Sequence, residues 1–201
     1  PATPARDIGF DRSMVGGYGQ DDRVDAYAAL MAEIEVKDPA FTTICVLADK
    51  EEIGSYGIAG MGSTSAFDWL RQLCRRQGAD DIRAFRASLC LSADVNAAFD
   101  PTFPDVLEKN NAAYLNRGVC VTKYTGARGK SSTNDASAEV MAFVTNLLDA
   151  EGVCWQTGEL GKVDQGGGGT IAKYVANRNV DTVDIGVPML SMHAPFELVA
   201  K

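Results

Sequence analysis

The stretch Asp49-Lys-Glu-Glu-Ile-Gly54, together with the run at 41–48 before it, predicts the fold of this chain. The run is short, uncharged and rich in β-branched residues, so it predicts a buried strand. The stretch after it places two adjacent carboxylates, Glu51 and Glu52, on a loop at the C-terminal end of that strand. Ligands of open α/β sheets collect at this edge. Because neighbouring side chains diverge at a turn, one glutamate can bind a cation while the other faces a substrate. The alternative interpretation is a solvated acidic turn.

The composition is that of a globular protein. The 201 residues suffice for one domain with a sizeable core, and 46% of them are hydrophobic and 23% charged. The formal net charge is -8, whereas a phosphate backbone attracts a basic face, so nucleic acid is not an expected partner. No stretch of about 18 apolar residues occurs, so we expect no membrane partner either.

Cysteine and histidine usage restricts the kinds of metal site that the chain can form. No two of the five cysteines lie closer together than Cys74 and Cys90, which excludes zinc-ribbon and redox Cys-x-x-Cys spacings. All five occur in apolar surroundings, which predicts buried free thiols in a reducing compartment and hence a cytoplasmic location. His193 is the single histidine of the sequence. Any metal site formed by this chain must therefore depend on carboxylates.

Helical and strand patterns alternate along the chain. Helices are predicted at 21–36, 64–76 and 135–150, with a short one ending near 177. Besides 41–48, strands are predicted at 88–92, 118–124, 153–157 and 182–187, while 78–82 is predicted as a connector and 188–193 as a loop. This alternation predicts an α/β fold, a three-layer αβα sandwich around a mixed, largely parallel sheet.

Candidate ligands occur where these predicted elements begin or end. They are Asp21, with Asp22 beside it as a rival, then Glu51, Glu52, Asp94 and His193. Each alone is commonly a cap, a turn residue or a structural histidine. Together they provide three carboxylates and an imidazole as ligands and one spare carboxylate. Such a set suits two divalent ions that share a bridging carboxylate and lie about 3.5–4 Å apart with a water between them.

Five stretches of the sequence resemble the aspartyl aminopeptidase and vacuolar aminopeptidase I family of dizinc metallo-aminopeptidases. They occur in the family's order and span most of the chain: Gly19-Gln-Asp-Asp-Arg-Val24, Asp49-Lys-Glu-Glu-Ile-Gly-Ser55, Leu91-Ser-Ala-Asp94, Val121-Thr-Lys123 and Leu190-Ser-Met-His193. The resemblance implies a zinc-exopeptidase fold, peptide substrates with a free N-terminus, and removal of one N-terminal residue at a time. It also implies assembly into large homo-oligomers, which in this family are tetrahedral dodecamers.

The resemblance also implies a role for each matching residue. Asp21 would bridge two metal ions, zinc in the first place, with cobalt or manganese as alternatives. Glu52 and His193 would bind one ion and Asp94 the other. Glu51 would be the general base. The same resemblance places Lys123 near the substrate pocket, where its ammonium could pair with an acidic substrate side chain; the alternative for Lys123 is an ordinary surface residue.

The chain departs from the family's pattern in what it lacks. The family has an upstream His-x-Asp motif and an inserted dimerisation domain, and neither is found here. We therefore interpret 1–201 as the C-terminal part of one metallopeptidase catalytic domain, incomplete at the N-terminus. We expect this chain to be inactive alone. The alternative from another functional class is a non-catalytic proteolytic fragment that acts as a scaffold or assembly piece.

Overall fold

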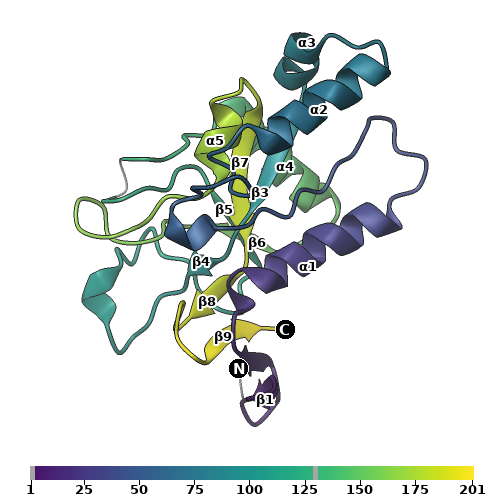
Figure 1. Ribbon diagram of the computed structural model, residues 1–201. Helices are drawn as coiled ribbons and strands as arrows, with labels where there is room; N and C mark the ends of the chain where they lie inside the picture. Colours follow the sequence, from purple (N-terminus) through teal and green to yellow (C-terminus); the bar gives the residue numbers. More distant parts are fainter. Residues whose placement is uncertain (1–2, 129–130) are drawn as a thin grey trace.

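The computed structural model describes residues 3–128 and 131–201, which form two sheets with helices around them (Figure 1). The first sheet has four strands in the order β3-β7-β5-β6. Strand β7 runs parallel to β3 and antiparallel to β5, and β6 runs parallel to β5. The bounds are β3 Leu89–Ala93, β5 Val119–Thr122, β6 Trp155–Thr157 and β7 Asp181–Gly186. The predicted α/β class and the mixed sheet are confirmed.

The second sheet was not expected from the sequence. Its five strands follow the order β1-β2-β9-β8-β4, and only the β4–β8 pair is parallel. They are β1 Arg6–Ile8, β2 Met14–Gly17, β4 Asn96–Ala97, β8 Pro188–Leu190 and β9 Glu197–Ala200. Strands of two to four residues are too short for an alternating pattern to stand out. For this reason β8 was predicted as a loop.

Two neighbouring strands continue from the first sheet into the second. Strand β3 leads into β4 and strand β7 leads into β8. The two segments are parallel neighbours in both sheets. Between the sheets they remain connected, because the N–H of Asp94 donates to the carbonyl of Ile185 (3.2 Å) and the N–H of Asn96 to that of Val187 (2.9 Å). We call residues 94–95 and 186–187 the sheet junction.

The helices agree with the sequence with two differences. They are α1 Gln20–Glu35, α2 Ser65–Arg76, α3 Asp81–Arg86, α4 Ala138–Ala150 and α5 Ala172–Ala176, with short 3-10 helices η1 Glu51–Ile53 and η2 Pro104–Val106. Helix α3 replaces the end of the predicted connector, because the Asp80 carboxylate caps it by accepting from the N–H of Arg83 at 2.7 Å. Helix α4 begins later than predicted, since Ser137 is its N-cap. Within the described ranges no helix is long and apolar enough to cross a membrane.

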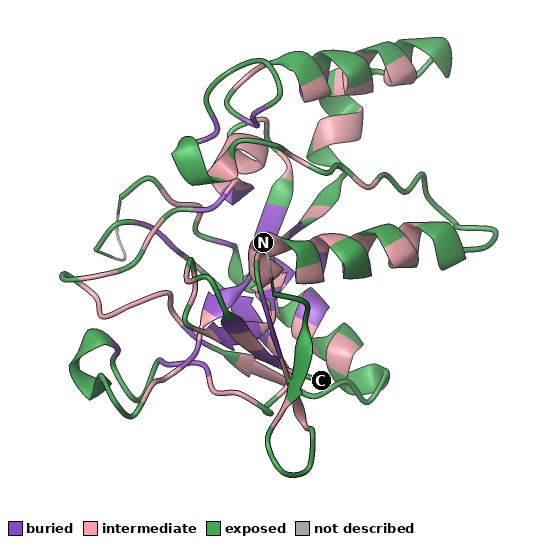
Figure 2. Ribbon diagram, turned by 60° about the horizontal axis from the view of Figure 1, so that its bottom comes forward, coloured by how far each residue is buried: buried purple, intermediate pink, exposed green. Residues whose placement is uncertain are grey.

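The main core lies between the four-stranded sheet and α4. Val121 and Val183 are fully buried and pack with Val140 and Val144 of α4. Buried residues concentrate in the strands, whereas the helices α1, α2 and α3 consist mostly of exposed and half-buried residues (Figure 2). Helix α1 lies on the front side of the sheet in Figure 1 and α4 behind it, so the strands run between helices.

The predicted strand at 41–48 is wrong. Phe41 and Leu47 are 84% and 58% exposed, and among the described residues none forms a backbone hydrogen bond with any residue of 37–48. The segment returns from the end of α1 toward η1 as an extended loop (Figure 1). A β-rich sequence forms a strand only where another strand offers its backbone groups, and the described part of the chain offers none here.

Truncating a core valine should measure how much the main core contributes to stability. We expect Val183→Ala to lower the free energy of unfolding by about 2 kcal/mol, because two methyl groups leave a packed site. The matched control Val153→Ala changes a residue that is 42% exposed and should stay within about 0.5 kcal/mol of the parent. Denaturant unfolding followed by circular dichroism gives both values. Equal effects would contradict the assignment of the core.

Candidate metal centre

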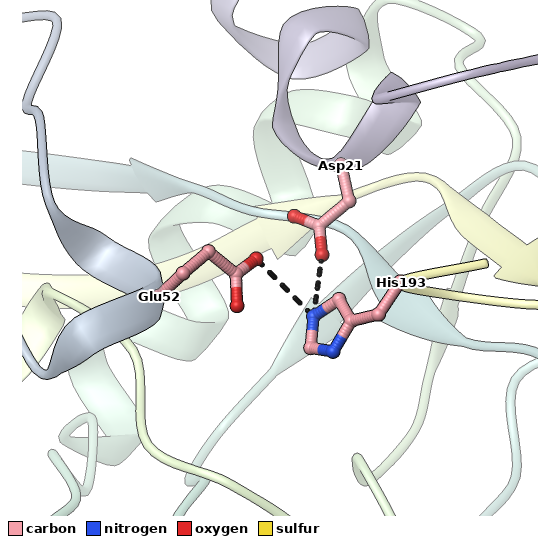
Figure 3. A group of neighbouring side chains, drawn as sticks. All are labelled: Asp21, Glu52 and His193. Atoms are coloured by element: carbon pink, nitrogen blue, oxygen red, sulfur yellow. Dashed lines mark ion pairs between the residues drawn. The ribbon is translucent and has the colours of Figure 1, made fainter. Parts of the chain in front are cut away.

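Three side chains from distant parts of the sequence converge at one end of the four-stranded sheet. Asp21 lies at the start of α1, Glu52 in η1, and His193 in the turn between β8 and β9. The Nε2 atom of His193 lies 2.9 Å from Oδ2 of Asp21 and 3.2 Å from Oε1 of Glu52 (Figure 3). One donor atom from each residue lies within 4.8 Å of the other two. The arrangement is one that a single divalent ion could bridge.

A second group of donors shares Asp21 with the first. One oxygen from each of Asp21, Asp22 and Asp94 lies within 4.8 Å of the others. The backbone of Asp21 and Asp22 is not helical, so the regular turns of α1 begin after Asp22. Because Asp21 contributes an oxygen to both donor groups, it lies where a carboxylate that bridges two ions would be needed.

The sheet junction positions Asp94. This residue follows β3 directly and lies beside Gly186, the last residue of β7. A Cβ atom on Gly186 would lie 1.8 Å from the carbonyl oxygen of Asp94 and 2.5 Å from Oδ2 of Asp25. Only glycine therefore permits this close approach. The requirement could not be recognised from the sequence, because it depends on which strands are neighbours.

Backbone hydrogen bonds around η1 hold the two glutamates in place. The N–H of Gly54 donates to the carbonyl of Glu51 and the N–H of Ser55 to that of Lys50, both at 2.8 Å. The hydroxyl of Tyr174 in α5 donates to the carbonyl of Gly54 at 2.9 Å. Glu51 is not in either group of converging donors. The two adjacent glutamates thus occupy different surroundings, as the sequence predicted for this turn.

Crowding and burial make these carboxyls difficult to ionise. Burial, followed by the nearby charge of Asp22, raises the pKa of Asp94 to about 9, and burial with the charges of Asp25 and Asp21 raises the pKa of Asp22 to about 8. Burial and the charge of Glu52 raise the pKa of Asp21 to about 6, against the opposing effect of His193. Burial is also the main cause of the raised pKa of Glu51.

Asp22 and Asp25 form a buried pair that sequence reasoning missed. Asp25 is 6% exposed, and its Oδ2 accepts from the N–H of Val187 at 3.3 Å, which ties α1 to the sheet junction. The two carboxyls are hydrogen-bonded, and burial raises the pKa of Asp25 to about 6. Their spacing of three residues at the start of a predicted helix was the available signal, but the sequence indicated Asp22 only as a rival of Asp21.

The donor set suits a hard or borderline divalent ion. Carboxylate oxygens with one imidazole nitrogen are ligands of zinc and of manganese or cobalt. In addition, Oδ1 of Asp22 is buried and has no hydrogen-bond partner among the described residues. A buried acceptor without a donor is costly, and a cation would satisfy it.

Lys123 is an exposed residue whose ammonium has two partners within the chain. Its ammonium forms an ion pair with Asp135 and donates to the carbonyl of Ala136 at 2.8 Å. It also lines a shallow hollow with Tyr124 and Glu159. Its predicted role in substrate binding stays a prediction.

Comparison with known proteins identifies the family. The model of the aminopeptidase I zinc metalloprotease family, M18, matches residues 1–201. The chain belongs to the M18 family of aminopeptidases. It is 50% identical over 205 residues to a probable M18 family aminopeptidase 1 of Clostridium acetobutylicum and 47% identical over 206 residues to that of Thermotoga maritima.

Solved M18 structures show the same fold. The crystal structure of aminopeptidase I from Clostridium acetobutylicum matches all of this chain with a TM-score of 0.94 at 50% identity. Yeast aminopeptidase 1 matches 98% of it with a TM-score of 0.80 at 24% identity, which indicates a shared fold. The whole chain aligns with both bacterial relatives, but it spans only 44% and 46% of their lengths. It is therefore less than half as long as either of these two relatives.

The raised pKa values predict how the metal-free M18 chain responds to pH. Asp94, Asp22 and Asp21 bind protons in the folded state at pH values where the unfolded chain, with carboxyl pKa values near 3.9, has lost them. Stability contributed by these protons is complete below about pH 4 and is lost as pH rises toward 9. The loss reaches at most about 1.4 kcal/mol per pH unit for each carboxyl.

Asp94→Asn keeps the shape of the side chain and removes its titration. In the presence of a chelator, we expect the parent to unfold at a lower denaturant concentration at pH 8 than at pH 5, and the variant to show a smaller difference. The control Asp105→Asn changes an exposed residue and should behave as the parent does. Stability that rises between pH 5 and pH 8 would contradict the electrostatic account.

Proposed function

We propose that this chain is part of a metallo-aminopeptidase that removes the N-terminal residue of peptides at a centre of two divalent ions. The observation that carries the proposal is the convergence of two donor groups on Asp21, one of which includes His193. Membership of the M18 family supports the reaction class. Zinc is the metal that the family's name indicates, and the carboxylate-rich donors would also accept cobalt or manganese.

Each residue has a distinct role in this proposal. Asp21 would bridge the two ions, Glu52 and His193 would hold one, and Asp94 would hold the other. Bound ions of this kind supply a water of lowered pKa and polarise the scissile carbonyl. Glu51 accepts the proton of that water and later returns it to the leaving amine, which a carboxyl held beside the ligands but outside both donor groups can do. The free α-amine of the substrate would be anchored by the surrounding carboxylates.

The wider properties follow from the family and extend the proposal. A solved relative, the yeast enzyme, is described as a dodecamer, and we propose that the intact protein is a homo-oligomer. All five cysteines are free thiols, which supports a reducing compartment such as the cytoplasm. The prediction that all five are buried is wrong, because only Cys120 is buried and Cys154 is exposed. The substrates are peptides with a free N-terminus, and an acidic first residue would pair with Lys123 in place of Asp135.

We further propose that 1–201 acts as the C-terminal part of one catalytic domain and is inactive alone. The chain spans 44% of its Clostridium relative. The segment at 37–48 is supporting evidence, because it has the composition of a strand but forms no backbone hydrogen bond with the described residues. The Asp21–Asp22–Asp94 group has no imidazole, and the sequence has no second histidine to provide one.

Metal content and turnover test the proposal together. We expect the purified chain to bind one divalent ion at the Asp21–Glu52–His193 group and to release almost no product from aminoacyl chromogenic substrates. A chimera, in which this chain replaces the matching 44% of the Clostridium relative, should bind two ions and turn over substrate. Turnover by the isolated chain at the chimera's rate would refute the incomplete domain. Absence of bound ions in both proteins would favour a scaffold instead of an enzyme.

The role of Glu51 can be tested in the same chimera. Glu51→Gln should lower kcat by about 10²–10⁴-fold, the usual contribution of a general base, while the metal content stays at two ions. Glu108→Gln, an exposed glutamate, is the matched control and should leave kcat unchanged. An unchanged kcat in Glu51→Gln would assign proton transfer to another group.

Lys123 provides a separate test of substrate selectivity. We expect Lys123→Ala in the chimera to reduce the ratio of kcat/KM for aspartyl over leucyl substrates by about 10-fold or more, because a charged hydrogen bond is lost. Lys109→Ala, an exposed lysine, is the control. An unchanged ratio would leave Lys123 with only its structural contacts to Asp135 and Ala136.

A further inference from the structure

A fully buried glutamate outside both donor groups contacts the backbone of two predicted ligands. Glu197 in β9 is 2% exposed. Its Oε2 accepts from the N–H of Gln20 at 2.6 Å and from the N–H of Asp21 at 3.1 Å, while Oε1 accepts from the N–H of His193 at 2.8 Å. Among the described residues, no other side chain hydrogen-bonds the backbone of both Asp21 and His193.

The five-stranded sheet explains why Glu197 can reach both. Strand β9 lies between β2 and β8, with Glu197 opposite Gly17 and Leu198 opposite Leu190. The chain beyond β2 leads to Asp21, and the chain beyond β8 leads to His193. The side-chain amide of Gln20 also donates to the carbonyl of Glu197 at 2.7 Å, which attaches the start of α1 to β9. Glu197 thus lies between the segments that carry two of the three donors in the first group.

The Glu197 carboxylate is fully hydrogen-bonded to backbone N–H groups around the site. A buried carboxylate is costly unless donors surround it, and here three backbone N–H groups satisfy it. His193 has a φ of 66°, a left-handed conformation that non-glycine residues rarely adopt and that its N–H bond to Glu197 helps to hold. Both Asp21 and His193 therefore depend on one side chain for their backbone geometry.

We propose that Glu197 is a positioning residue of the metal centre: its buried carboxylate holds Asp21 and His193 at the separation that one divalent ion requires, before the ion binds. The proposal rests on the metal centre put forward above. It differs from a general stabilising role, because it predicts a loss of metal affinity that exceeds what a comparable loss of stability would cause. Residues that orient metal ligands typically contribute 10–100-fold in affinity.

Zinc titration of the 201-residue chain, with a competing chelating dye, separates these roles. Glu197→Gln keeps the size of the side chain but turns an amide NH₂ toward one of the N–H donors, so we expect Zn²⁺ affinity to fall about 10–100-fold. Val199→Ala is the matched control, because it weakens the packing of the same strand at a residue that is 3% exposed and that packs with Val95 and Met189. It should lower the unfolding midpoint and leave Zn²⁺ affinity within about twofold.

Glu197→Asp keeps the charge on a shorter side chain and should fall between the parent and Glu197→Gln in affinity. If Glu197→Gln and Val199→Ala lose affinity in proportion to their loss of stability, Glu197 is merely structural and the proposal is wrong. If the parent binds zinc and Glu197→Gln binds it equally well, the positioning role fails while the proposed function stands. If the parent binds no zinc, the proposed metal centre fails and the role of Glu197 in it fails too.

Amide hydrogen exchange provides a readout that needs neither a variant nor a metal. In the metal-free parent, the N–H groups of Asp21 and His193 should exchange at least 10-fold more slowly than that of Ser191. Ser191 lies in the same turn as His193, and its N–H has no protein acceptor among the described residues. In Glu197→Gln this protection should be lost at one or both sites. Exchange of the parent's two amides as fast as that of Ser191 would overturn the proposal even if no variant of Glu197 folds.

Discussion

The site depends on one constraint, which is that two neighbouring parallel segments each contribute a strand to both sheets. Strands β3 and β7 are neighbours in the first sheet, and their continuations β4 and β8 are neighbours in the second. The backbone must turn at the sheet junction while both chains stay paired, which brings Asp94 against Gly186. Asp25 attaches α1 to the same junction through the N–H of Val187. Two sheets and a helix are therefore attached to one another at the sheet junction.

The sheet junction brings carboxylates close together in spite of their repulsion. Carboxylates repel one another, and an open chain would separate Asp21, Asp22 and Asp94. Here the fold holds one oxygen of each within 4.8 Å of the others, so burial, and after it their mutual repulsion, raise their pKa values. The rigid strands and the buried Glu197 carboxylate supply the opposing force. A site of this kind favours whatever neutralises it, either protons or divalent cations.

The sequence predicted the positions of the candidate ligands better than their surroundings. Asp21, Glu52 and His193 occur where patterned elements begin or end, and the structure brings them together. Asp25 and Glu197 were missed, because a single acidic residue in a helix or a short strand has the pattern of a solvated one. Burial of such a residue is decided by pairing between distant segments, which a local pattern does not contain. The same limit explains the error at 41–48, whose composition indicates a preference for strand but not the presence of a neighbour.

The two donor groups differ in a way that connects the chemistry to the fold. The Asp21–Glu52–His193 group contains an imidazole, whereas the Asp21–Asp22–Asp94 group contains only carboxylates. Asp94 follows β3, which is an edge strand of its sheet, and the segment at 37–48 leads into η1 and Glu52. Asp94, one member of the group that lacks an imidazole, thus lies at the end of the edge strand β3. Leu91 of this edge strand is 50% exposed, so the open side of the sheet and the group without an imidazole meet at the end of β3.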